Sequence, residues 1–197
     1  MTFKLGLTGS IGMGKSATAQ LFVEEGCALW DADAAVHRLY GTGGGAVEAI
    51  AKAFPEAIRE GEVSRQALKQ IFADDPTALT VIESIVHPLV AQDRLECLES
   101  STSDITVLDI PLLFETGSDS QMDAVVCVSI PEDIQQKRVM ARGTMTEEQF
   151  LQIKSNQMPN SEKEAKSDYV IITDTVEHAR LQVQNVLKDI RGRLEHA

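Results

Sequence analysis

An eight-residue stretch near the N-terminus, Gly9–Ser16 (GSIGMGKS), constrains what this chain can fold into more than any other feature. It fits the pattern G-x-x-x-x-G-K-[ST]. It stands between Phe3–Thr8, which is typical of a short strand, and Ala17–Glu25, which has apolar residues at helical spacing. The glycines let the backbone approach an anion closely, so that successive N–H groups and the N-terminus of the next helix face it. In such loops the lysine reaches the β- and γ-phosphates, and the serine hydroxyl can bind Mg²⁺. The stretch predicts a nucleotide phosphate site.

The composition of the 197 residues is that of an ordinary globular protein, 43% hydrophobic and 24% charged. No apolar run is long enough for a membrane span and no secretory signal is recognisable, so we expect a cytoplasmic protein. Cys27, Cys97 and Cys127 are far apart and odd in number, which favours buried reduced thiols over disulfides or a zinc site. A formal net charge of −12 argues against binding to nucleic acid or to an anionic membrane. We expect a small-molecule ligand and make no prediction of the oligomeric state.

Strands and helices alternate along most of the chain. Beyond the first strand, continuous apolar runs predict strands at Cys27–Trp30, Ile105–Asp109, Asp123–Val128 and Tyr169–Ile172. Such runs, alternating with helices, indicate a parallel sheet covered on both faces, which is an α/β fold. The last helix carries an apolar stripe that we assign to the core: Val176, Ala179, Val183, Val186, Leu187, Ile190 and Leu194.

Residues 34–100 differ from the rest of the chain because they carry almost no strand signal. Helical spacing and cap residues predict helices at Ala34–Tyr40, Ala46–Phe54, Ser64–Phe72 and Thr77–Leu98, the last interrupted by Pro88. We therefore expect a helical insertion packed over the edge of the sheet.

Three aspartates follow predicted strands, at the sheet edge where the ligands of parallel sheets bind. Asp31 and Asp33 come after the second strand, and we expect only one of them to face the phosphates. That carboxylate could accept a proton from an acceptor hydroxyl or orient Mg²⁺-bound water, while the other could cap the next helix; the residues alone leave the choice open. Asp109 ends the third strand, where a carboxylate can hold Mg²⁺ through water.

A phosphate loop alone is compatible with several enzyme classes, and the rest of the sequence narrows them. No Asn-Lys-x-Asp element of guanine-specific proteins occurs, and the chain is short for a motor module. A small kinase remains, which needs an acceptor pocket, a base and cations over the transferred phosphoryl group. Arg138 and Arg142 are four residues apart on a predicted helix that leads into a polar segment, as expected of a lid that closes on ATP. His37, one turn beyond Asp33, could reach the acceptor, whereas His87 is more typical of a cap or of packing.

These features together resemble the dephospho-CoA kinase family, in motifs that span nearly the whole chain in the family's order. The matching stretches are LTGSIGMGKS at Leu7–Ser16, DADAAVHR at Asp31–Arg38, EGEVSRQAL at Glu60–Leu68, HP at His87-Pro88, DIPLLFE at Asp109–Glu115, the pair Arg138 and Arg142, QMP at Gln157–Pro159 and SDYVI at Ser167–Ile171. The first motif is generic to phosphate loops, whereas the D-A-D-x-x-x-H and P-L-L-F-E elements are far more specific.

The resemblance implies ATP-dependent phosphorylation of the ribose 3′-hydroxyl of dephospho-CoA, on a P-loop kinase-type core with a five-stranded parallel sheet. The implied boundaries are residues 1–33, 101–141 and 167–197 for the core, 34–100 for a CoA-binding subdomain and 142–166 for a lid. Asp33 would be the base, with Lys15 and Arg142 as the other catalytic residues. ATP would bind at Gly9, Ile11, Gly12, Met13, Gly14, Lys15, Ser16, Ala17, Arg138 and Arg142. Dephospho-CoA would bind at Asp33, His37, Arg65, His87, Pro111, Leu112, Leu113 and Glu115, and Mg²⁺ at Ser16 and Asp109.

The chain departs from the family pattern at three places. Ala17 replaces a second hydroxyl residue after the lysine, Gly143 stands where an acidic residue often follows the lid arginine, and Thr173-Asp174 often reads Asp-Asn. None of these positions touches the expected chemical step. Two other functions are compatible with the loop: another small-molecule P-loop kinase, of nucleoside or shikimate type, and a nucleotide-gated binding protein without an acceptor.

Overall fold

The computed structural model describes residues 2–196, which divide into two units. The first contains the residues up to Leu29 and those from Ser101 onward, and the second contains Trp30–Ser100. The helical insertion expected at residues 34–100 falls inside the second unit, while a separate lid at residues 142–166 stays a prediction. Among the described helices, none is both long enough and apolar enough to cross a membrane.

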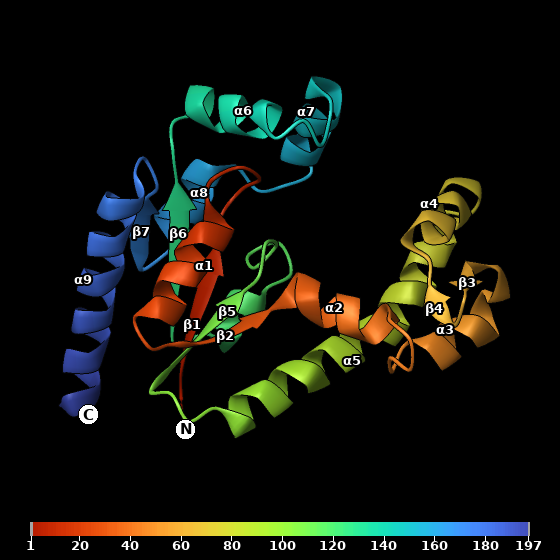
Figure 1. Cartoon of the computed structure of the whole chain (residues 1–197), viewed down its shortest axis with the longest axis horizontal. Coiled ribbons are helices and arrows are strands. Elements are labelled where there is room, and N and C mark those ends of the chain that lie inside the picture. The colour runs from red at the N-terminus through yellow and green to blue at the C-terminus, as the bar shows by residue number, and fades with distance from the viewer. Residues whose placement is uncertain (1, 197) are drawn as a thin grey trace. The chain divides into compact units, whose positions relative to one another are not determined.

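The central sheet has five parallel strands in the order β2-β5-β1-β6-β7 (Figure 1). Its strands are β1 (Phe3–Thr8), β2 (Ala28–Asp31), β5 (Ile105–Asp109), β6 (Ala124–Ser129) and β7 (Tyr169–Ile172). β1 lies in the middle, with Leu5 opposite Val107 of β5 and Ala124 of β6. The predicted α/β class and the five-stranded parallel sheet are therefore confirmed.

Two helices cover one face of this sheet and pack against each other: α1 (Lys15–Glu24) and α9 (Val176–Glu195) (Figure 1). Leu5 and Leu7 of β1 share a core with Phe22 of α1 and Val183 of α9, and all four are fully buried. Burying a large aliphatic or aromatic side chain contributes about 1.5–3 kcal/mol, so this face supplies much of the stability of the unit.

The predicted core stripe of α9 is wrong at both of its ends. Ala179 and Ile190 are buried as expected, but Val176 is 57% exposed and Leu194 is 43% exposed. Val176 is the first residue of the helix and Leu194 lies in its last turn. Helix ends have fewer packed neighbours than helix middles, which periodicity alone does not reveal.

The opposite face of the sheet is covered by the segment that follows β5 and by α8 (Asn160–Lys166). A Cβ atom on Gly6 of β1 would lie 2.7 Å from Cδ1 of Leu113, so that segment lies directly on the strand. Ser129 of β6 faces α8, because its hydroxyl donates to Oε1 of Glu164 at 2.6 Å. This face therefore fixes both the segment after β5 and α8 against the sheet.

Two more helices, α6 (Glu132–Ala141) and α7 (Glu147–Ser155), lie beyond the carboxyl end of β6 (Figure 1). The segment expected only as a polar lid is thus largely helical. Thr146 and Gln149 form a capping box at the start of α7. The pattern Thr-x-x-Gln before a helical stretch is a sequence signal for the start of a helix, and it was not recognised here.

The second unit has its own core and seven elements, of which α5 is the longest. They are α2 (Ala32–Tyr40), α3 (Val47–Ala53), η1 (Pro55–Ala57), β3 (Ile58–Arg59), β4 (Glu62–Val63), α4 (Arg65–Asp74) and α5 (Thr77–Ser100). Ile50, Leu68 and Ile82 are buried at its centre. Asp93 of α5 accepts hydrogen bonds from the indole of Trp30 (2.7 Å) and from the guanidinium of Arg38, which ties α2 to α5.

Two expectations for this unit are wrong. It contains a small antiparallel hairpin, β3–β4, whose turn places Glu60 and Gly61 at positive φ of 52° and 83°. Strands of two residues are too short to give an alternating pattern. Helix α5 also runs through Pro88 without a break. Proline removes one backbone hydrogen bond, but Val86 before it and Leu89 after it pack into the same core, which offsets that loss.

The three cysteines are free thiols, as predicted. Cys27 and Cys127 are buried, and burial raises the pKa of the first to about 11 and that of the second to about 12. Neither is therefore a thiolate nucleophile at neutral pH. Cys97 is less buried than expected.

Candidate active site

The predicted phosphate loop connects β1 to α1 and ends in the N-terminus of that helix. The first i→i−4 bond of α1 joins the N–H of Thr18 to the carbonyl of Gly14 (3.1 Å). The N–H groups of Lys15, Ser16 and Ala17 precede that bond, so they are the groups a helix N-terminus offers to an anion. Gly14 has φ +93°, and a Cβ there would lie 2.9 Å from Oγ1 of Thr173. Glycine is thus required by both conformation and space.

Lys15 and Asp109, which the sequence assigned separately, lie together. The Lys15 ammonium donates to Oδ1 of Asp109, at the end of β5, and the Asp109 side chain is only 1% exposed. Ser16 is exposed in the first turn of α1. A carboxylate and a hydroxyl are the hard oxygen donors that Mg²⁺ prefers, and Mg²⁺ usually completes its shell with phosphates and water. The described residues hold no cluster of three or more His, Cys, Asp or Glu.

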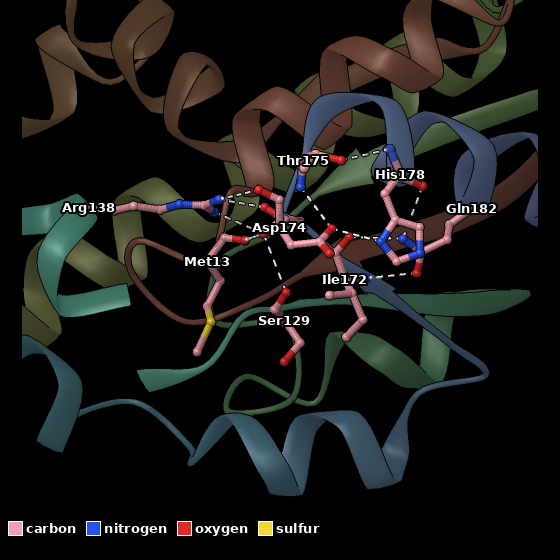
Figure 2. A network of polar contacts seen from close by, with 9 residues as sticks. Met13, Ser129, Arg138, Ile172, Asp174, Thr175, His178 and Gln182 are labelled. Carbon is pink, nitrogen blue, oxygen red and sulfur yellow. Dashed lines mark hydrogen bonds and ion pairs between the residues drawn. The ribbon is translucent and has the colours of Figure 1, made fainter. Parts of the chain in front are cut away.

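Arg138 links α6 to the loop between β7 and α9, as Figure 2 shows. Its Nη2 donates to the carbonyls of Thr173 (2.6 Å) and Asp174 (3.3 Å), and its Nη1 donates to Oγ1 of Thr173 (3.2 Å). The Thr173 hydroxyl in turn donates to the carbonyl of Met13 at 2.7 Å. Arg138 is therefore coupled to the phosphate loop through Thr173, a residue noticed in the sequence only as a departure from the family.

The rest of the network in Figure 2 fixes the start of α9. Thr175 caps this helix by accepting from the N–H of His178, and Asp174 pairs with the His178 ring at 2.7 Å. The hydrogen bond from His178 holds the pKa of Asp174 below its ordinary value. Gln182 bonds both backbone groups of Ile172, which satisfies the end of the edge strand β7. Arg142 takes no part in this network: it is the exposed C-cap residue of α6.

The segment Pro111–Glu115, expected to form part of the acceptor wall, is held by α8. The ammonium of Lys163 lies 2.9 Å from Oε1 of Glu115 and donates to the carbonyl of Pro111 at 3.0 Å. Lys163 is fully buried, whereas the Glu115 side chain is 19% exposed. Within the segment, Leu112 is 41% exposed, but Leu113 is fully buried on the sheet and does not reach the surface.

Replacing Glu115 by glutamine should lower the free energy of unfolding, because it leaves the Lys163 ammonium buried without its counter-charge. Breaking a buried ion pair in this way costs about 3–5 kcal/mol, and we expect a value near the lower end of that range. Lys163→Met should cost less, since the partly exposed Glu115 can be hydrated. Urea unfolding measures both. The double variant should be more stable than Glu115→Gln alone, and simple additivity of the two losses would contradict the pairing. Glu132→Gln is the control, because it breaks an exposed pair with Lys154 worth at most about 1 kcal/mol.

The effect of Glu115 should also depend on pH. Partial burial raises the pKa of Glu115, but the hydrogen bonds from Lys163 and from the N–H of Met158 outweigh it, so this pKa lies below its ordinary value. A carboxyl with a lowered folded-state pKa contributes stability above its unfolded pKa of about 4.3 and loses it as the pH falls further. The difference between wild type and Glu115→Gln should therefore shrink in acid.

In the second unit, the capping role that the sequence left open belongs to Asp31. Its Oδ1 accepts from the N–H of Ala34 at 2.8 Å, at the start of α2. Asp33 lies in the first turn of α2 and is exposed, and so is His37 one turn later. Arg65 and His87 are also exposed, on α4 and α5. How these residues meet the phosphate loop stays a prediction.

Several residues that shape the site were not recognised in the sequence. Thr173 and Lys163 are examples: each contacts residues more than forty positions away, at Met13 and Pro111 respectively. Others have amide side chains that bond the loop: Gln135, Gln157 and Asn160. Of these only Gln157 had a sequence signal, the motif QMP at Gln157–Pro159, which the family resemblance included without a role.

The comparisons with a family model, with known sequences and with solved structures agree. The family model described as dephospho-CoA kinase matches residues 3–178. The dephospho-CoA kinase of Ruegeria pomeroyi is 65% identical over 197 residues, which cover all of both chains. A solved structure from Thermus thermophilus is similar with a TM-score of 0.85 at 31% identity, over 98% of each chain. The dephospho-CoA kinase from Campylobacter jejuni shares the fold, with a TM-score of 0.71 at 23% identity over 98% of this chain and 100% of that one. The chain therefore belongs to the dephospho-CoA kinase family.

Proposed function

We propose that this protein transfers the γ-phosphoryl group of ATP to the ribose 3′-hydroxyl of dephospho-CoA, giving CoA and ADP in the last step of coenzyme A biosynthesis. The observation that carries the proposal is the pairing of Lys15 with the buried Asp109 at the helix N-terminus that ends the phosphate loop. Phosphoryl transfer depends on groups that position and stabilise the phosphate charges. A lysine, a carboxylate and the N–H groups of a helix N-terminus, placed close together, are groups of this kind. Family membership supplies the acceptor.

On the nucleotide side, Gly12–Ala17 surround the phosphates. The N–H groups that face them are those of Gly12 and of Gly14–Ala17, because the N–H of Met13 donates to the carbonyl of Ser10 at 3.1 Å. Lys15 exchanges Asp109 for the β- and γ-phosphates when the nucleotide binds, because a triphosphate carries more negative charge than one carboxylate. Ser16 and Asp109 are then the residues that hold Mg²⁺, which neutralises charge on the phosphate oxygens. Arg142, exposed at the end of α6, is the lid cation that meets the transferring group once the lid closes.

On the acceptor side, Asp33 accepts the proton of the ribose 3′-hydroxyl as its oxygen bonds to the γ-phosphorus. The bond between that phosphorus and the bridging oxygen breaks, and ADP leaves with the electron pair. His37, Arg65 and His87 bind the acceptor in the second unit, and Pro111, Leu112 and Glu115 form part of its wall. We place the enzyme in the cytoplasm, with these small molecules as its partners.

An acceptor panel tests the function. ADP release, measured by a coupled assay with ATP and Mg²⁺, should depend on dephospho-CoA and stay near background with adenosine or shikimate. Remote contacts to the long tail position the reacting hydroxyl, so truncation to adenosine should lower the rate as well as the binding. Equal efficiency with adenosine would favour a nucleoside-type kinase. Nucleotide binding with no acceptor-dependent ADP release would favour a nucleotide-gated binding protein.

A further inference from the structure

Three amide side chains hold the first part of the phosphate loop from outside. The N–H of Ser10 donates to Oδ1 of Asn160 (3.1 Å), and the N–H of Ile11 donates to Oε1 of Gln157 (3.0 Å). The carbonyl of Ile11 accepts from Nε2 of Gln135 at 2.7 Å. These backbone groups are bonded to side chains, so the N–H of Ile11, a residue that the family resemblance assigns to ATP, is engaged by Gln157. The N–H groups that we propose face the phosphates begin at Gly12.

The connection between α7 and α8, which carries Gln157, and the start of α8, which carries Asn160, are themselves fixed. The N–H of Met158 donates to Oε1 of Glu115 at 2.8 Å. The Asn160 amide also donates to Oε1 of Glu164 at 2.9 Å. Because its neighbours are already held, Gln157 loses little further freedom when it bonds Ile11, and a preorganised contact of this kind keeps more of its energy.

One side of this part of the loop packs closely, because a Cβ on Gly12 would overlap Cγ2 of Val139. On its other side the three amides line a pocket of about 820 Å³ together with Ser10 and Met13. The hydrogen bonds of the amides therefore hold the loop on the side where packing is open.

Gln135 is fully buried, and its Oε1 has no hydrogen-bond partner among the described residues. A buried oxygen without a hydrogen bond raises the free energy of the folded state. Gln135 has such an oxygen, while its Nε2 donates to the carbonyl of Ile11.

We propose that Gln157 is a positioning residue: through the Ile11 N–H it keeps the phosphate loop in the shape that accepts a nucleotide, and it ties that shape to the α7–α8 connection. The inference rests on the proposed use of ATP at this loop. Without the bond, the loop spends part of its time in other shapes, and the apparent nucleotide affinity falls with the fraction that is competent. Saturating nucleotide restores that shape, so the maximal rate changes little.

Three variants test the proposal. Gln157→Met keeps the length of the side chain but removes the acceptor oxygen, whereas Gln157→Glu keeps an acceptor. Gln152→Met, at an exposed position of α7, is the matched control. ADP with Mg²⁺ is titrated by calorimetry, beside KM for ATP, kcat and melting temperature. We expect Gln157→Met to weaken ADP binding and to raise KM for ATP by roughly five- to tenfold, with kcat within about twofold. The control should behave as wild type.

Hydrogen exchange of the Ile11 amide in the nucleotide-free protein tests the contact apart from the function. The amide should be protected in wild type and in Gln157→Glu, and should lose protection in Gln157→Met. Unchanged exchange or unchanged ADP affinity in Gln157→Met would overturn the inference. So would weaker ADP binding by Gln157→Glu than by Gln157→Met, because charge repulsion would then place residue 157 against the nucleotide itself. Failure of the wild type to bind ADP would count against the proposed function, while exchange would still decide the contact.

Discussion

Lys15→Ala should lower the maximal rate of dephospho-CoA phosphorylation by at least about 10³-fold. The Lys15 side chain is 16% exposed and holds its ammonium against Asp109 at the end of β5, the place where we propose the β- and γ-phosphates bind. There its charge stabilises the phosphoryl oxygens most strongly in the transition state, so the loss should fall on kcat as well as on KM. Coupled ADP release at saturating ATP and dephospho-CoA measures it.

The same substitution takes the cation from a carboxylate that is 1% exposed, so part of the activity loss could come from unfolding. The double variant Lys15→Ala/Asp109→Asn removes both charges, so its melting temperature measures how much of the stability loss comes from the buried carboxylate. Its melting temperature should recover towards that of wild type while its activity stays low. Activity of Lys15→Ala within about tenfold of wild type, with unchanged circular dichroism, would reject the assignment of the loop.

The strands of the sheet could be predicted because their signal is local. The predicted bounds Ile105–Asp109 and Tyr169–Ile172 coincide with β5 and β7, since each is an apolar run between polar residues. The path of α5 through Pro88 could not be predicted. It depends on Val86 and Leu89 packing against residues far away in the sequence, and propensity carries no information about such neighbours.

The phosphate loop was equally predictable, since eight consecutive residues specify it, but the groups that hold it were not. Gln157 and Thr173 contact Ile11 and Met13 across roughly 150 residues of chain. Lys163 sits in the polar stretch NSEKEAK, which reads as a solvated helix, and it is buried because Glu115 lies beside it. Buried polar residues are satisfied by partners that the fold supplies, so the sequence shows the residue types but not the pairs.

Asp31 and Asp33 could not be told apart from the sequence. Alternation along a strand leaves the two equivalent. The hydrogen bond from the N–H of Ala34 gives Asp31 the cap of α2, and Asp33 is exposed in the first helical turn. This placement supports Asp33 as the base, because its carboxylate is not needed by the helix.

Asp33→Asn should therefore cut kcat by about 10²–10⁴-fold, the usual contribution of a positioned general base. A ribose hydroxyl is a weak nucleophile at neutral pH, and asparagine keeps the size of the side chain while removing its basicity. ATP affinity should change little, because Asp33 is assigned to the acceptor. Steady-state kinetics with both substrates varied, and nucleotide titration, measure the two quantities.

Asp31 provides the matched control for this experiment. Asn is as good an N-cap as Asp, so Asp31→Asn should stay close to wild type in rate and stability, whereas Asp31→Ala should lose about 1 kcal/mol of stability and keep its kcat. Melting curves recorded beside the kinetics separate these effects. An inactive Asp31→Asn together with an active Asp33→Asn would exchange the two roles: the cap would then be dispensable, and the carboxylate that bonds the helix would be the one that accepts the proton.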